Sequence, residues 1–100
     1  MWCPITYYEF YDVPRLFVVE RRGRVVVFDC PFDDDEDEYV TQYAVYCFSE
    51  LPESVLNGAY LSAVLSGKEP FGRVAVDAVV FDDSRRKAID DYVLNALLGE

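Results

Sequence analysis

The chain contains no histidine. Without an imidazole, neither a Ser-His-Asp nor a Cys-His catalytic arrangement can form, and the usual general base near neutral pH is missing. A zinc site with histidine ligands is excluded for the same reason. Any catalysis would have to use carboxylates, tyrosines, lysine or cysteine alone.

Glycine and cysteine are also scarce. The five glycines are scattered and form neither a G-x-G-x-x-G nor a P-loop pattern, so the sequence predicts no nucleotide-binding loop. Cys3, Cys30 and Cys47 are an odd set without a C-x-x-C pair. We therefore expect small buried thiols, and neither disulfides, a reactive nucleophile nor a structural zinc site. No cofactor is expected.

Positive charge is the third deficit, with nine basic against nineteen acidic side chains and a net charge of −10. A protein that neutralises phosphates needs a basic face, so we expect no direct binding to nucleic acid or to anionic lipid. The apolar runs are far shorter than the roughly 20 residues needed to span a bilayer, and the N-terminus lacks a secretory signal pattern. These features favour a cytoplasmic protein without a membrane segment.

The residues that are present indicate a globular chain. With 100 residues, of which 52% are hydrophobic, we expect one domain over residues 1–100 that folds without disulfides or metals. Two β-rich runs, near 15–20 and 24–30, flank Gly23, which suits a tight hairpin turn. A third run near 43–49 is rich in aromatic and β-branched residues and predicts another strand.

The second half of the chain alternates helix and strand patterns. Apolar residues at helical spacing predict helices near 52–66 and 84–98, and an apolar run predicts a strand near 73–81. Asp83 or Ser84 would cap the second helix. Its predicted apolar stripe is Ile89, Tyr92, Val93, Ala96 and Leu97. The order βββαβα predicts an α+β two-layer domain with a mostly antiparallel four-stranded sheet and two helices, or alternatively a partly open small β-barrel with appended helices.

Six consecutive acidic residues join the second predicted strand to the third: Asp33, Asp34, Asp35, Glu36, Asp37 and Glu38. Their alternate aspartates begin like a calcium loop, but Glu38 and Ala44 stand where such a loop needs glycine and a bidentate glutamate. We therefore predict an exposed hairpin loop and no specific metal site. Solubility, protection of a sheet edge and docking of a basic partner are all open as its role.

Aromatic residues are concentrated near the N-terminus: Trp2, Tyr7, Tyr8, Phe10 and Tyr11. Such residues are enriched at interfaces, because they bury a large area while a polar tip stays hydrogen-bonded, but they also cover small cores. We take Trp2, Tyr7 and Tyr8, together with the six acidic residues, as the candidate partner-binding residues.

By elimination, the sequence favours a small acidic, non-enzymatic protein-interaction module, such as an inhibitor or immunity-type binder of a basic partner. The alternatives are an enzyme that uses carboxylate or tyrosine chemistry, and a structural or oligomerising domain. The residues predict neither the identity of a partner nor the oligomeric state.

Overall fold

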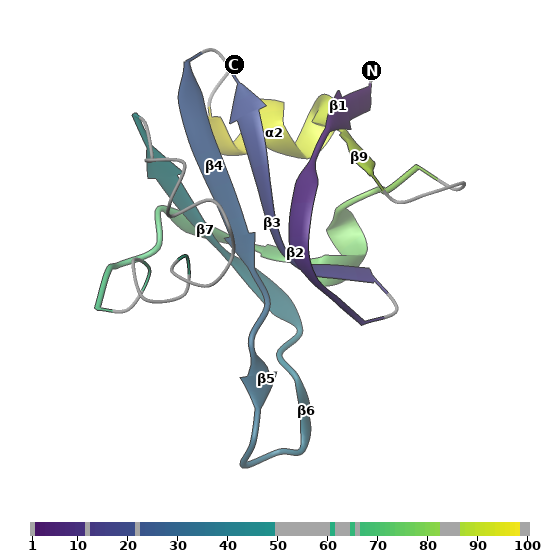
Figure 1. Ribbon diagram of the computed structural model, residues 1–100, viewed down its shortest axis with the longest axis vertical. Helices are drawn as coiled ribbons and strands as arrows, with labels where there is room; N and C mark the ends of the chain where they lie inside the picture. Colours follow the sequence, from purple (N-terminus) through teal and green to yellow (C-terminus); the bar gives the residue numbers. More distant parts are fainter. Residues whose placement is uncertain are drawn as a thin grey trace.

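The computed structural model describes residues 2–11, 13–21, 23–49, 61, 65, 67–82 and 87–98. Its centre is a five-stranded antiparallel sheet with the strand order β2-β3-β4-β7-β8 (Figure 1). These strands are β2 (Thr6–Tyr11), β3 (Val13–Arg21), β4 (Arg24–Asp29), β7 (Gln42–Phe48) and β8 (Gly72–Ala75).

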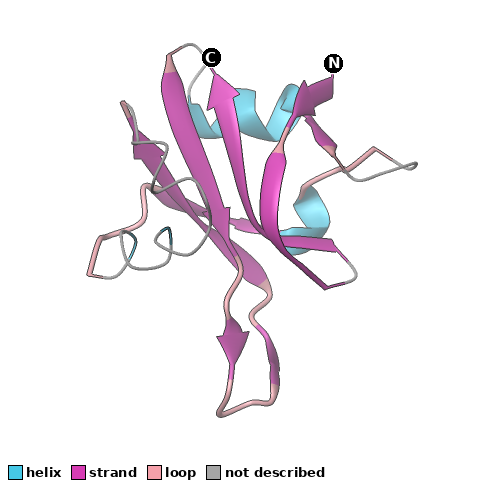
Figure 2. Cartoon of the chain, in the orientation of Figure 1, coloured by secondary structure: helices cyan, strands magenta, loops and turns pink. Residues whose placement is uncertain are grey.

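Smaller elements flank this sheet. β1 (Trp2–Pro4) pairs with β9 (Ala88–Asp90), and β5 (Phe32–Asp33) pairs with β6 (Glu38–Tyr39). A 3-10 helix, η1 (Val76–Ala78), follows β8, and the α-helix α2 (Asp91–Leu98) follows β9 (Figure 2). No helix in the described part of the chain is long and apolar enough to cross a membrane.

The β3–β4 hairpin forms the middle of the sheet because its side chains are buried on both faces. On one face Phe17, Phe28 and Tyr43 pack with residues of β9 and α2, namely Ile89, Val93 and Leu94. On the other face the buried residues are Leu16, Val18, Val25, Val27, Leu61 and Leu65. Burial on both faces explains why these strands are continuously apolar instead of alternating. Gly23 turns the hairpin at φ 75°, a left-handed conformation that favours glycine.

The structure confirms the strands expected near 15–20, 24–30 and 43–49, but the predicted fold class is wrong. The sheet has five strands, and α2 is the one α-helix with defined bounds among the described residues. The missed strand is β2, in which register shifts between Tyr7 and Phe10 disturb the alternation that identifies a strand. The alternative of a partly open barrel with appended helices is wrong as well, because the described residues form a five-stranded antiparallel sheet with one α-helix of defined bounds.

The elements predicted at 73–81 and 84–98 are both shorter than expected. β8 ends at Ala75, after which the Val76 N–H bonds to the Thr41 carbonyl and the chain enters η1. Ala88–Asp90 form a strand against β1, and α2 begins only at Asp91. The Asp90 carboxylate caps this helix by accepting a 2.9 Å hydrogen bond from the Tyr92 N–H.

Two of the predictions fall largely on residues that the structure does not describe. Residues 83–86, which include the expected capping residues, lie outside the described part. So does the helix predicted at 52–66, except for Leu61 and Leu65, which are helical and buried. The predicted stripe of the last helix is partly wrong, because Tyr92 is 77% exposed while Leu94 is fully buried.

Candidate functional site

The β5–β6 hairpin projects from one end of the molecule (Figure 1). Residues 34–37 form its turn, and the Asp33 carboxylate accepts hydrogen bonds from the Asp35 N–H at 3.0 Å and the Glu36 N–H at 3.4 Å. Asp37 closes the turn at φ 57°, which aspartate tolerates better than most residues. The predicted exposed hairpin loop is thus confirmed, and its turn is organised by one of its own carboxylates.

The hairpin presents its charge to solvent. The side chains of residues 34–38 are exposed, and Asp33 is partly buried. Among the described residues no group of three or more Cys, Asp or Glu side chains is placed to hold a metal ion. The exposed carboxylates therefore form a negatively charged surface on the hairpin.

Aromatic rings line the base of the hairpin. Tyr39 stacks on Tyr11 with ring centroids 5.5 Å apart and meets Phe32 edge to face at 5.2 Å. Tyr11 is 63% exposed and Phe32 is 46% exposed, so both rings border the solvent. An acidic tip above exposed aromatic rings combines long-range attraction with apolar contact area.

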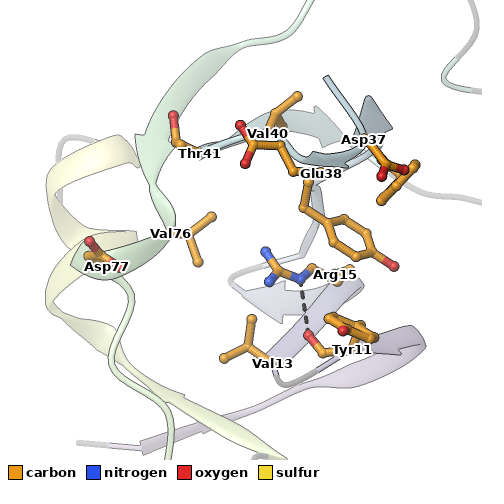
Figure 3. A pocket seen from close by; sticks show the side chains of 11 residues that line it. Tyr11, Val13, Arg15, Asp37, Glu38, Val40, Thr41, Val76 and Asp77 are labelled. Atoms are coloured by element: carbon orange, nitrogen blue, oxygen red, sulfur yellow. Dashed lines mark hydrogen bonds between the residues drawn. The ribbon is translucent and has the colours of Figure 1, made fainter. Parts of the chain in front are cut away.

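Arg15 lies at the floor of a cleft of about 670 Å³ beside the hairpin (Figure 3). Pairing with β2 skips this residue, since Glu9 faces Leu16 and Phe10 faces Pro14, so Arg15 occupies a β-bulge that redirects its side chain. The cleft is lined by Tyr11, Val13, Arg15, Phe32, Asp37, Glu38, Tyr39, Val40, Thr41, Val76 and Asp77.

The Arg15 side chain connects β2, the segment that follows β4, and the hairpin. It is only 8% exposed, and its Nε donates a 3.1 Å hydrogen bond to the Tyr11 carbonyl. Its Nη1 donates to the Cys30 Sγ at 3.3 Å, and its Cζ lies 4.4 Å from the centre of the Tyr39 ring. Hydrogen bonds and a cation–π contact therefore hold this buried cation in place.

Cys30 continues the same network. Its thiol is fully buried and donates to the Val40 carbonyl at 3.2 Å, while its backbone N–H donates to the Arg15 carbonyl at 2.7 Å. The expectation of a buried thiol at Cys30 is confirmed. Cys3 and Cys47 are partly buried thiols, and no disulfide joins any of the three, all of which the structure describes.

A second groove, of about 650 Å³, shares Phe32 and Tyr39 with the Arg15 cleft and is also lined by Glu9, Phe10, Asp29 and Pro31. In the sheet, Leu16 lies opposite Glu9 on one side and opposite Asp29 on the other. Directly paired residues share a face, so both carboxylates belong to the same face of the sheet. Burial raises the pKa of Asp29 above its usual 3.8, and the negative charge of Glu9 is a second, smaller cause of the same increase.

The three aromatic residues predicted to bind a partner, Trp2, Tyr7 and Tyr8, are not gathered at the hairpin. Trp2 lies in β1, at the opposite end of the molecule from β5 and β6 (Figure 1). Tyr8 packs against the second core cluster, and burial raises the pKa of its phenol. Tyr7 contacts Phe10, with ring centroids 5.5 Å apart. The structure thus separates Trp2 from the six acidic residues, and it places Tyr8 against the core.

The residues that do surround the hairpin were mostly missed as site residues. Arg15 is the one charged residue in the apolar run from Val13 to Val19, and Asp29 ends another apolar run; such isolated charges were the available signal. The contacts of Tyr39 with Arg15 and Tyr11 depend on long-range pairing and have no local signature.

Comparison of the chain with protein-family models, with curated proteins and with solved structures finds no match.

Proposed function

We propose that this protein is a non-catalytic interaction module that docks a basic protein partner through the β5–β6 hairpin and the aromatic rings at its base. The single observation behind this proposal is the projecting hairpin, which has exposed carboxylates at its turn and the rings of Phe32 and Tyr39, with Tyr11 stacked on Tyr39, at its base. The net charge of −10 acts in the same direction, because it attracts a basic partner before contact.

The two parts of this surface have different tasks in binding. Exposed carboxylates accelerate association with an oppositely charged protein and add little to the lifetime of the complex. Aromatic side chains that become buried supply much of the affinity at protein interfaces. The network of Arg15, Cys30 and Tyr39 supports the docking role, because it fixes the hairpin on the sheet before binding and so reduces the entropy lost on association.

The experiment that tests this proposal is affinity capture from a host lysate at low salt with three forms of the protein. These are the wild type, a hairpin variant with Asp34→Asn and Glu36→Gln, and a control variant with Glu20→Gln and Glu69→Gln. Both variants lose two negative charges from exposed positions, but Glu20 lies in β3 next to the β3–β4 turn and Glu69 precedes β8.

The proposal expects a basic protein that the wild type and the control variant retain equally and the hairpin variant retains less. Equal retention by all three forms would show that the hairpin does not select the partner. Capture of only acidic or neutral proteins would contradict the proposal as well.

One observation favours an enzymatic alternative. A partly buried carboxyl with a raised pKa next to a second carboxylate, in a groove, is an arrangement that general acid–base catalysis uses. This alternative is tested by assaying wild type and Asp29→Asn with generic ester, glycoside and phosphate substrates. Turnover by the wild type that Asp29→Asn abolishes would establish catalysis and remove the non-catalytic assignment.

A further inference from the structure

The groove between β2 and the hairpin combines two carboxylates with aromatic walls. Glu9 and Asp29 lie two strands apart on one sheet face, on either side of Leu16, and Phe10, Phe32 and Tyr39 supply the rings. Carboxylates attract a cation, and aromatic faces contact it favourably through their quadrupoles. The same rings also accommodate the aliphatic stem of a long cationic side chain.

The two carboxylates have no counterion within the described part of the chain. Neither makes a hydrogen bond or ion pair there, and both influences on the Asp29 pKa, burial and the Glu9 charge, disfavour its ionised form. Along the same row of the sheet the next cation is Arg73, which lies opposite Ala44, and Ala44 in turn lies opposite Asp29. Arg73 is as many strands from Asp29 as Glu9 is, but it lines a different pocket and, unlike Glu9, does not contribute to the shift in the pKa of Asp29.

Arg15 does not neutralise the pair through the sheet. Its side chain is directed to the opposite face, where it contacts Cys30 and one side of the hairpin. Phe32 and Tyr39 line both cavities, of which one already contains the cation Arg15 and the other contains the two carboxylates.

We infer that this groove is a binding site for one arginine or lysine side chain, supplied by the basic partner. The inference rests on the proposed function and deepens it: the exposed hairpin attracts the partner, and the groove receives one cationic side chain between Asp29, Glu9 and the aromatic rings. Continuity supports this occupant, because Phe32 and Tyr39 belong both to the groove and to the proposed docking surface.

The test uses a defined probe and needs no partner. The peptide acetyl-Gly-Arg-Gly-amide is titrated into labelled protein at low salt, and backbone amide shifts are followed by NMR. The matched peptide carries citrulline, a neutral side chain of nearly the same shape, in place of arginine. The expected result is saturable shifts at the groove with the arginine peptide and none with the citrulline peptide.

Three variants locate the binding. Asp29→Asn and Glu9→Gln should each weaken the arginine peptide at least about threefold, the size of one lost ion pair at a partly exposed site. Asp34→Asn also removes one charge but lies at the hairpin turn, and it should change the affinity less than either groove variant. Asp29→Asn relieves the repulsion from Glu9, so the variant remains folded for the comparison.

A second readout separates binding from a structural effect. Saturation with the arginine peptide should lower the pKa of the Asp29 carboxyl, measured by carbon NMR, because a nearby cation favours the ionised form. Shifts confined to residues 34–37, or equal affinity for the arginine and citrulline peptides, would overturn the groove inference. Binding confined to the turn would still leave hairpin docking intact, and the capture experiment decides that proposal separately.

Discussion

The guanidinium of Arg15 lies against the ring of Tyr39, with 4.4 Å between the Arg15 Cζ and the ring centroid. Arg15 is near the start of β3, an interior strand of the sheet, and Tyr39 is in the projecting hairpin. This contact therefore joins a buried cation of the sheet to the exposed acidic hairpin. It gives the hairpin a fixed direction, on which the docking proposal depends.

Removing Arg15 should destabilise the fold. Arg15→Ala deletes hydrogen bonds to the Tyr11 carbonyl and the Cys30 sulfur as well as the cation–π contact, so we expect a loss of about 2–3 kcal/mol in unfolding free energy. Urea denaturation measures it. Arg24→Ala, at an exposed position, is the control and should stay within about 0.5 kcal/mol of wild type. Equal effects of the two changes would refute the structural role of Arg15.

Three segments, namely the β3–β4 hairpin, β2 and Ala88–Asp90, show how far the sequence could predict the structure. The β3–β4 hairpin was predictable, because its apolar runs and Gly23 are local signals. β2 was not, because its bulges interrupt the alternation of side chains. Ala88–Asp90 was read as helix, since only long-range pairing with β1 makes it a strand.

The candidate site was predictable only in part. Six adjacent carboxylates between two strands indicate an exposed hairpin loop, which the structure has. The groove depends on a register that places Glu9 and Asp29 on either side of Leu16, although they are far apart in the sequence. No local pattern specifies such a juxtaposition.

The buried hydroxyl of Tyr43 should contribute measurably to stability. It donates a 2.7 Å hydrogen bond to the Pro14 carbonyl, and Tyr43→Phe leaves that carbonyl without this donor. We expect a loss of about 1–2 kcal/mol in chemical denaturation. Tyr92→Phe is the matched control, because Tyr92 is largely exposed, and it should be nearly neutral. An unchanged midpoint for Tyr43→Phe would contradict this prediction.

The carboxyl of Asp29 should make stability depend on pH. Its pKa is higher in the folded state than its usual 3.8, so the folded protein binds the proton more tightly than the unfolded chain. Stability should therefore decline as the pH rises from 3.8 through the folded pKa. Asp29→Asn should be more stable than wild type at pH 7, and this advantage should vanish below 3.8.

Thermal or urea denaturation of both proteins across this pH range measures the effect. Glu20→Gln, at an exposed position in β3, serves as a control for loss of one charge. A difference between wild type and Asp29→Asn that stayed constant with pH would show that titration of Asp29 is not its origin.

The turn at Gly23 should resist substitution for conformational reasons alone. A Cβ built on Gly23 meets no atom within 4 Å, but the residue has φ 75°. Gly23→Ala should therefore lower the unfolding free energy by about 1 kcal/mol, the usual cost of an L-residue in the left-handed region. Gly23→Asn, which tolerates this region better, should lose less in the same denaturation experiment. Equal losses for the two substitutions would contradict a conformational origin.

The central claim is that the β5–β6 hairpin docks a basic partner electrostatically, and the association rate tests it most directly. Stopped-flow measurements with the captured partner, from low to high salt, compare wild type, the hairpin variant and the control variant. We predict slower association and a flatter salt dependence for the hairpin variant, with its dissociation rate much less affected and the control variant close to wild type. An association rate for the hairpin variant equal to that of wild type at low salt would contradict the account.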